Sequence, residues 1–300
     1  MDQDRLSMVR LSIDRSVNIA VCGPLTGPRS AYGDMLKAEC EHLRQANVHL
    51  QHFDDMANPE QAIAVAKTVI AEQFDVVIGH FNSYCSLAVK NLYREAKIGF
   101  ISPLSTNPEL TLEQGGALFC PSDDDQLQAL VSEAEKAGKR IYVFHDGSPY
   151  SKNLISQLGQ RFPEERILNA FEQFPTEAAG DSMVFLAGAH CNLVQPHIAL
   201  RKAYPTLKIV GCDDCYIDEY FDDLAHVANQ HDFVMGQAKG HEGNLRNAVQ
   251  YLNDVIHSIP KDTPFFNVIG QNTANYQFNA NGRVASAVWQ LLPLQSLVKP

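Results

Sequence analysis

Residues 17–53 read VNIAVCGPLTGPRSAYGDMLKAECEHLRQANVHLQHF and carry the pattern that decides the fold. Val17–Cys22 is a short apolar run followed directly by a Gly-Pro pair, which is typical of a buried strand. Ser30–Ala46 then places apolar residues at helical spacing without a proline, and Val48–Phe53 alternates apolar and polar residues as a second strand does. The stretch therefore predicts a strand–helix–strand unit.

The same alternation continues along most of the chain. Asn58 and Pro59 form a helix start, with an Asn cap before a proline at the first helical position. Strand–helix alternation at this spacing indicates parallel sheets covered by helices on both faces. Because one open sheet with this many strands would be very large, we expect an α/β protein with two doubly wound parallel-sheet lobes. Further strands are expected at residues 75–79, 98–102, 140–144, 167–171, 183–186 and 207–210, and further helices at 58–70, 86–96, 125–137, 150–162, 193–203 and 217–228.

The last part of the chain departs from this pattern. Asn244–Ile259 predicts one more helix, and Phe265–Gly270 predicts a strand. Asn275–Phe278 and Arg283–Leu292 also read as strands, and the sequence NANG at 279–282 between them predicts a hairpin turn. A hairpin at this place suggests that the chain returns to a lobe it had left.

Composition argues against several classes of protein. Hydrophobic residues make up 45% of the 300 residues and charged residues 20%, which is the balance of a folded chain rather than a disordered one. The formal charge of -11 argues against binding to nucleic acids or anionic membranes, which favour a basic face. No apolar run approaches the roughly 18 residues that span a bilayer, so no direct membrane insertion is expected.

Two features bear on the cellular compartment. The first fifteen residues carry charges every few positions and lack the uninterrupted apolar stretch of about 7–15 residues found in a secretory signal. The seven cysteines are odd in number and too few for a disulfide scaffold, which favours a reducing compartment. We therefore expect the chain as given to be cytoplasmic, or periplasmic if a signal peptide was trimmed or the start misassigned.

Polar loops follow the predicted strands of the first half. In open α/β sheets ligands bind outside the carboxyl ends of the strands, beside helix N-termini. The loops at 79–86 and 103–109 are rich in hydroxyl groups, which suit a carboxylate ligand together with free helix-start N–H groups. The alternative is that these hydroxyls only cap helices. The hydroxyl residues concerned are Ser83, Ser86, Ser105 and Thr106.

In the second half, Asp213 and Asp214 follow the strand predicted at 207–210. Two carboxylates at a strand end could receive an ammonium group, although a helix cap would use them equally well. Hydroxyls in one lobe and aspartates in the other would together fit a zwitterion.

At these loops the sequence resembles a known family, the type I periplasmic binding proteins of branched-chain amino acid transporters, in its Leu/Ile/Val-binding group. The resemblance is dense between about residues 17 and 160 and thinner to about 236. The motifs that carry it are AVCGPLTGPRSAYGD at 20–34, DDMANPEQAIAVA at 54–66, VIGHFNSYCS at 77–86, ISPLSTNPELT at 101–111 and HDGSPY at 145–150.

The resemblance implies two lobes that are joined by a three-stranded hinge and close over a ligand. It places an N-terminal lobe at residues 1–124 plus about 238–272. A C-terminal lobe would comprise 125–237 plus about 273–300.

The resemblance also implies roles for individual residues. Ser83 and Thr106 match the family residues that bind the ligand α-carboxylate, and the backbone of Leu104 matches an acceptor for the ammonium group. Asp213 matches the acidic partner of the α-amino group, with Asp214 beside it. The aromatic residues expected to line the cleft are Tyr32 and Tyr150.

The sequence departs from the family in several places. The aromatic residue that selects the ligand side chain should fall near Ala189 and His190, where no Tyr is present, so a larger or polar side chain is expected beside His190. The positions of a common family disulfide hold Ala57 and Asn82. The chain is shorter than usual between about 240 and 270. A cytosolic relative that senses amides and controls a transcription antiterminator shares this fold without transport.

Enzyme functions find less support. No Gly-x-Gly-x-x-Gly follows a strand, and the loop at 23–30 has neither the spacing nor the lysine of a phosphate loop, so no cofactor is expected. The histidines show no metal-ligand pairing, so no metal is expected. Cys212-x-x-Cys215 lacks the context of a redox pair, and Ser83 lacks an assignable base.

We therefore expect a non-enzymatic solute-binding protein without catalytic residues. It would capture an amino acid or a derivative by hinge closure and present it to an ABC-transporter permease. The alternatives are a cytosolic amide or amino-acid sensor that controls a regulatory protein, and an enzyme that uses Cys212 and Cys215.

Overall fold

The computed structural model describes residues 15–158, 166–237, 239–285 and 288–298. The chain divides into two compact units. Unit 1 comprises Met1–Ser122 and His241–Ala287, and unit 2 comprises Asp123–Gly240 and Val288–Pro300. The chain first passes between the units after Ser122 and after Gly240, close to the boundaries expected at 124 and 238. The last such passage falls after Ala287, later than the expected boundary near 272.

Unit 1 is built on a five-stranded sheet in the order β2-β1-β3-β4-β5, and all its neighbouring strands are parallel. Ile19 in the inner strand β1 lies opposite Leu50 on one side and Val76 on the other. These strands are apolar because a parallel sheet is covered on both faces. Their bounds are β1 (Val17–Gly23), β2 (Val48–Asp54), β3 (Val76–Gly79), β4 (Gly99–Ser102) and β5 (Gly116–Leu118).

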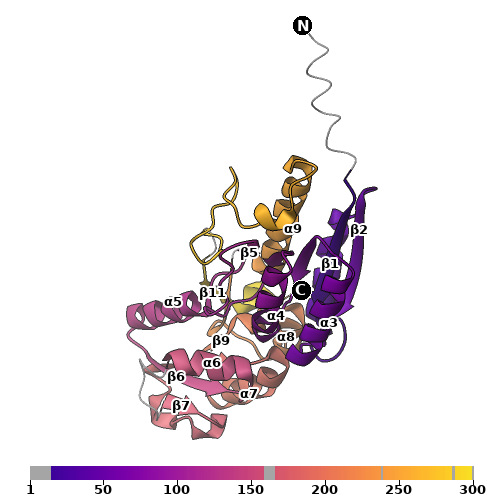
Figure 1. The fold of residues 1–300 in the computed structure, drawn as a ribbon. Helices are drawn as coiled ribbons and strands as arrows, with labels where there is room; N and C mark the ends of the chain where they lie inside the picture. Colours follow the sequence, from indigo (N-terminus) through magenta and orange to yellow (C-terminus); the bar gives the residue numbers. More distant parts are fainter. Residues whose placement is uncertain (1–14, 159–165, 238, 286–287, 299–300) are drawn as a thin grey trace. The chain divides into compact units, whose positions relative to one another are not determined.

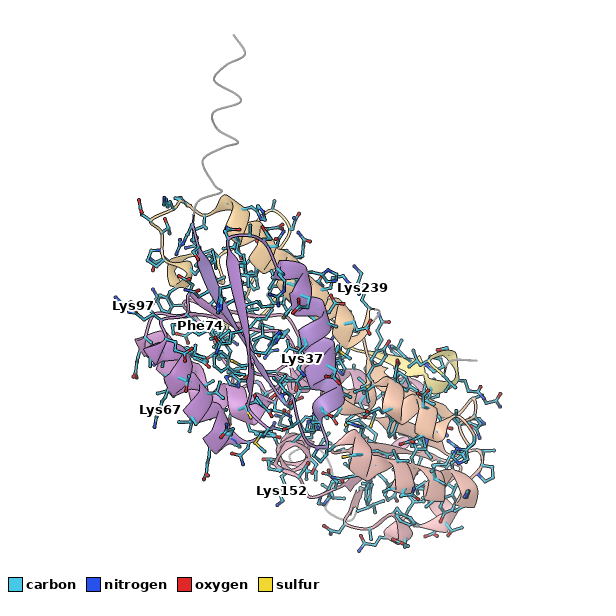
Figure 2. The ribbon with its side chains drawn as sticks, turned by 90° about the vertical axis from the view of Figure 1, so that its right-hand side faces the viewer. Lys37, Lys67, Phe74, Lys97, Lys152 and Lys239 are labelled. Carbon is cyan, nitrogen blue, oxygen red and sulfur yellow. The ribbon has the colours of Figure 1, made fainter. Side chains whose placement is uncertain are left out.

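The helices of unit 1 lie on both faces of this sheet. Figure 2 shows the helix that carries Lys37 on one side of the strands and the helix that carries Lys67 on the other. This follows from topology, since β2 and β3 flank β1 on opposite sides and crossovers between parallel strands are right-handed. The helices are α2 (Ser30–Cys40), α3 (Pro59–Ala71), α4 (Ser83–Glu95) and α9 (Gly240–Ser258).

Helix α9 comes after the first segment of unit 2 in the sequence but packs in unit 1 (Figure 1). Arg246 on α9 bonds Glu39 on α2 at 3.1 Å, and Asn253 accepts from Gln45 at 2.8 Å. On the other face, α3 and α4 lie together and close the core. Core side chains there include Val65, Val69, Val77, Val89, Tyr93 and Phe100.

Unit 2 is built on a six-stranded sheet in the order β11-β10-β9-β8-β6-β7. All pairs are parallel except the antiparallel pair of β10 and β11. The strands are β6 (Arg140–His145), β7 (Ile167–Leu168), β8 (Ser182–Ala187), β9 (Lys208–Gly211), β10 (Asp232–Gly236) and β11 (Gln290–Pro293). The helices are α5 (Asp123–Lys136), α6 (Pro149–Leu158), α7 (His190–Ala203) and α8 (Asp218–Leu224). The prediction of two lobes with parallel sheets is therefore confirmed (Figure 1).

The C-terminal part differs most from the prediction. The strand predicted at Phe265–Gly270 is wrong: Phe265–Asn267 is a 3₁₀ helix, and the Ile269 N–H donates to the carbonyl of Phe265 at 2.9 Å. The turn at 279–282 is present, with a 2.9 Å bond from Gly282 N to Asn279 O. The segments beside it form only isolated bridges, and the extended strand in this part is the short β11.

Across the described ranges, no helix combines the length and the apolar character needed to cross a membrane.

Candidate functional site

The candidate residues of unit 1 lie where β3 and β4 end. Ser83 begins α4 directly after the β3 loop, and its Oγ accepts hydrogen bonds from Thr106 N at 3.1 Å and Asn107 N at 3.3 Å. Thr106 and Leu104, in the loop after β4, are both buried. The structure therefore brings Ser83, Thr106 and Leu104 together at one edge of the sheet.

The direction of the Ser83 proton follows from these contacts. A hydroxyl group has two lone pairs and one proton. Because Ser83 Oγ accepts from two backbone N–H groups, its own proton is available to a third group. An anionic oxygen is the partner that forms the strongest bond with such a donor.

A second set of hydroxyls forms the frame behind Ser83. Ser102 Oγ donates to Ser105 Oγ at 2.8 Å, and Ser105 Oγ lies 2.8 Å from Ser86 Oγ. Ser86 Oγ donates to the carbonyl of His80 at 2.9 Å. All three serines are fully buried, so they join the loops after β3 and β4 to each other. Ser86 and Ser105 thus have a structural role, but they join two loops and do not cap a helix as the sequence analysis considered.

A buried histidine fixes the start of the β3 loop. His80 Nδ1 lies 2.8 Å from Asp55 Oδ2, and His80 Nε2 lies 3.0 Å from Tyr93 Oη. Since Nδ1 faces a carboxylate oxygen, it carries a proton, and Nε2 faces the hydroxyl group of the tyrosine. Burial raises the pKa of Tyr93 well above its ordinary value, so the phenol stays a donor.

Tyr32 is fully buried in unit 1. Its ring centroid lies 4.2 Å from that of Phe81, and the Arg29 guanidinium lies 4.9 Å over its face. Tyr32 is thus part of the packed wall beside the β3 loop.

The sequence analysis did not single out one further candidate of this region, Asn82. Asn82 precedes Ser83 and is buried, and its Oδ1 finds no hydrogen-bond partner within the described ranges. A buried amide oxygen normally has a partner, such as a protein group, water or a ligand. Its place in the loop after β3 was the only available signal, because the resemblance marks Asn82 as a lost disulfide position.

In unit 2, Asp213 lies in a 3₁₀ helix (Asp213–Cys215) directly after β9 and is buried. Gln126 on α5 bonds it twice: Gln126 Nε2 donates to Asp213 Oδ1 at 2.9 Å, and Asp213 N donates to Gln126 Oε1 at 3.1 Å. Tyr150 Oη also donates to Asp213 Oδ1. Burial and the Asp213 charge raise the pKa of Tyr150 well above its ordinary value, so this donor keeps its proton.

Asp214 has a different environment from that of its neighbour. Its Oδ2 accepts from the backbone N–H of His190, the first residue of α7, at 2.8 Å. The His190 ring places Nδ1 3.2 Å from the same oxygen and Nε2 3.2 Å from Glu219 Oε2. Asp214 therefore holds the start of α7, where a negative charge is favourable, and orients His190.

Asp146 is a further carboxylate at this edge that the sequence analysis did not single out. Its Oδ2 accepts from Ala189 N at 3.0 Å and from Asn192 Nδ2 at 2.9 Å. Burial acts in the opposite direction, but the bonds from Asn192 and Ser148 hold the pKa of Asp146 below its ordinary value. A Cβ at Gly188 would lie 2.4 Å from the Asp146 carboxyl carbon, so only glycine allows this approach.

The cysteine pair stands on either side of Asp213 and Asp214 in the sequence. Cys212 and Cys215 are fully buried free thiols, and Cys212 Sγ donates to the carbonyl of Gly188 at 3.2 Å. Burial, together with the Cys212 sulfur, raises the pKa of Cys215 well above its ordinary value. Because the thiolate is the reactive form, this environment opposes nucleophilic or redox chemistry.

A separate cavity of about 440 Å³ lies in unit 1 away from these residues. Its lining includes Asp75, directly before β3, and Ile98, directly before β4, so it is at the opposite end of the sheet. Phe74 and Lys97, both marked in Figure 2, also line it.

Comparison with known proteins places this geometry in a family. Residues 16–182, more than half of the chain, match the family model described as periplasmic binding protein. The Leu/Ile/Val-binding protein homolog 2 of Brucella abortus is 30% identical over 163 residues, which cover 49% of this chain and 44% of that protein. The leucine-, isoleucine-, valine-, threonine- and alanine-binding protein of Pseudomonas aeruginosa is 30% identical over 215 residues, or 63% of this chain and 57% of that protein.

The matched stretches span about half the length of these relatives. Among solved structures, the leucine-binding protein LivK of Thermotoga maritima superposes with a TM-score of 0.74. The superposition covers 89% of this chain and 93% of LivK at 19% identity, so it bears on the fold alone.

Proposed function

This chain belongs to the periplasmic binding protein family, and we propose that it is a non-enzymatic solute-binding protein whose ligand is an amino acid or a close derivative. The observation that carries the proposal is the arrangement at Ser83. Its Oγ accepts hydrogen bonds from two backbone N–H groups, which leaves its own proton for a third group. The relatives named above, whose names state amino-acid binding, support the same class of ligand.

In the proposal, unit 1 holds the carboxylate of the ligand. The Ser83 hydroxyl donates to it, beside the buried Thr106 and Asn82, whose Oδ1 has no partner in the described part of the chain. The Asn82 oxygen can accept from the ammonium group or from a polar ligand side chain. A donor to an anion contributes about 1.5–3 kcal/mol, which is roughly a 10- to 100-fold change in Kd.

Unit 2 holds the ammonium group in this proposal. Asp213 supplies the charge, while Gln126 and Tyr150 fix the orientation of its carboxylate. The His190 ring, held between Asp214 and Glu219, stands where the resemblance places the side-chain selector. A polar ring at that place favours a ligand with a polar or larger side chain over a plain aliphatic one.

We propose further that the two half-sites close on one ligand. A ligand that contacts both units favours the closed state, because only there does it gain both sets of contacts. The closed form would then be read by an ABC-transporter permease, with the protein working in the periplasm as its family name implies.

The sensor alternative shares the ligand chemistry but has another partner and compartment. All seven cysteines are free thiols, and six of them are buried. Free thiols are the rule in a reducing compartment, which favours a cytoplasmic regulatory partner over a permease. Co-purification with a permease complex would support the transport function, and co-purification with a soluble regulator would support the sensor function.

A ligand screen tests the proposed function. Thermal melting and calorimetry against the twenty amino acids and their amides should find a compound that raises the melting temperature of the wild type. Ser83→Ala and Asp213→Asn should each weaken its binding about 10- to 100-fold. Lys67→Ala, on α3, is a surface control that should bind normally. Indifference of the wild type to every compound would refute the proposal, and turnover lost in Cys212→Ser would support an enzyme.

A further inference from the structure

The segment that returns to unit 1 near the end of the chain brings one buried arginine to the loop after β4. Arg283 follows the turn at 279–282, in which Asn279 Oδ1 accepts from Asn281 N and Arg283 N, both at 3.0 Å. Gly282 has φ 77°, a left-handed conformation that favours glycine.

The backbone on either side of Arg283 is fixed to the edge strand β5. Leu118 N donates to Gly282 O at 2.8 Å, and Val284 N donates to Leu118 O at 2.8 Å. Arg283 thereby pairs with Leu118 as a parallel bridge at the sheet edge. Its side chain starts from a defined point and is only 7% exposed.

The guanidinium group bonds three backbone carbonyls around the candidate carboxylate site. Nη1 donates to Ser105 O at 3.2 Å and to Cys120 O, and Nη2 donates to Asn107 O at 3.3 Å. The planar fork of an arginine can bridge several acceptors in this way, whereas a lysine offers a single point of charge.

One of these bonds decides which way the Thr106 N–H points. In a trans peptide the C=O and the N–H point in opposite directions, and the described ranges contain no cis peptide. Ser105 O and the Thr106 N–H belong to the same peptide. When Arg283 holds the oxygen on one side, the N–H must face the other side, where Ser83 Oγ accepts it.

We propose that Arg283 is a positioning residue for the ligand carboxylate. It fixes the Ser105–Thr106 peptide, whose N–H occupies a lone pair of Ser83 Oγ and so directs the Ser83 proton to the ligand. A cation on the carbonyl side also polarises the peptide and strengthens its N–H as a donor. This inference rests on the proposed function for the identity of the ligand, but not for the peptide geometry.

The first test uses the ligand-free protein. Arg283→Gln removes the charge and the fork, Arg283→Lys keeps only the charge, and Arg246→Gln is the matched surface control. We expect amide hydrogen exchange at Thr106 and Asn107 to rise at least about tenfold in Arg283→Gln and less in Arg283→Lys. Sheet amides such as Ile101 should stay unchanged in all three variants. Unchanged exchange at Thr106, or an equal rise in the sheet, would overturn the proposal.

The second test uses two probes, L-threonine and L-threoninamide, which differ in the anionic carboxylate. Arg283→Gln should weaken binding of L-threonine about tenfold or more and that of L-threoninamide by less than about threefold. An equal loss for both would mean that Arg283 is only a brace for the fold. If the wild type binds neither probe nor any compound of the screen, the proposed function fails, while the exchange experiment still decides the role of Arg283.

Discussion

Asp213 and Asp214 are adjacent and chemically identical, yet their carboxylates have different partners. Asp213 Oδ1 accepts from the side chains of Gln126 and Tyr150, whereas Asp214 Oδ2 accepts from the backbone of His190 at the start of α7. Asp214 is therefore tied to a helix end, and Asp213 to other side chains at the candidate site. The sequence offers no pattern that separates the two.

Matched substitutions should separate their roles. We expect Asp213→Asn to weaken amino-acid binding about 10- to 100-fold, because it removes the charge that the proposed function assigns to the ammonium group. Asp214→Asn keeps an oxygen for the His190 N–H and should change Kd by less than about threefold. Calorimetry on both variants with the compound found in the screen measures this difference. A larger loss in Asp214→Asn would reverse the assignment.

Asp232 is the residue whose protonation should control the acid stability of unit 2. Its Oδ1 lies 2.7 Å from His197 Nε2 and 2.5 Å from Arg201 Nη2, and its Oδ2 accepts from Asn229 N at 2.7 Å. Burial opposes the effect, but the bonds from His197 and Arg201 lower the pKa of Asp232 below its ordinary value. A carboxyl with a lowered folded-state pKa adds stability above its unfolded pKa, near 4, and this is lost as pH falls through the folded pKa.

Asp232→Asn should therefore be less stable than the wild type at pH 7, and the difference should shrink as the pH falls below about 4. Urea unfolding at pH 7, 4 and 3 measures both free energies. The exposed Asp34→Asn is the control, because the Asp34 carboxylate lies at the surface, 3.3 Å from Lys37 Nζ. A difference that stays constant or grows on acidification would contradict this account.

Residues that follow a strand could be predicted as site residues, and residues that reach the site from elsewhere could not. Ser83, Thr106 and Asp213 all stand where the chain leaves a strand of a parallel sheet, which is where ligands bind. Gln126 contacts Asp213 across 87 positions and Arg283 contacts Ser105 across 178, and no local pattern encodes such a contact. Nothing in the structure or the comparisons tests ligand contact by these residues, so their roles stay predictions.

At the level of elements, the start of a helix could be predicted where neighbouring residues in the sequence cap it. Asn58 Oδ1 accepts from Glu60 N at 2.9 Å and Gln61 N at 3.0 Å, and Pro59 begins α3 as expected. We expect Asn58→Ala to lower the free energy of unfolding by about 1 kcal/mol, the usual cost of losing an N-cap, and to leave ligand affinity unchanged. Chemical denaturation followed by circular dichroism measures the cost, and Asn58→Ser, which can still cap, should restore most of it. A loss of equal size in Asn58→Ser would show that packing, not capping, is responsible.

The strands that were missed depend on their neighbours. β5 (Gly116–Leu118) is a three-residue strand that forms because Phe100 and Ile101 in β4 offer a free edge. β10 starts at Asp232, a buried carboxylate, so its first residue reads as polar. The strand predicted at 265–270 failed for a related reason, since Pro264 precedes the segment and its phenylalanines pack into the core from a 3₁₀ turn.

At the scale of the molecule, each unit has its own sheet, and the chain passes between the units after Ser122, Gly240 and Ala287. Each half-site is therefore built within one unit. The Ser83 arrangement uses bonds from the same unit, and the Gln126–Asp213–Tyr150 arrangement does as well. In the proposed function, preformed half-sites would reduce the ordering cost of binding, so that more of the ligand's binding free energy would be available to favour closure.

If one ligand bridges both half-sites, it should slow amide hydrogen exchange in both of them at once. At about 100 times its Kd, a ligand stabilises the bound state by about 2.7 kcal/mol and slows any opening that requires its release by up to about 100-fold. We expect amide exchange to slow in residues 103–107 of unit 1 and in residues 212–215 of unit 2. Residues 259–263, at the other end of unit 1, should stay unchanged. Ser83→Ala at the same ligand concentration should lose most of this protection in both loops, because weaker binding releases both units together. Protection confined to one loop would mean that a single unit holds the ligand, and closure over a zwitterion would then be wrong even if binding itself is confirmed.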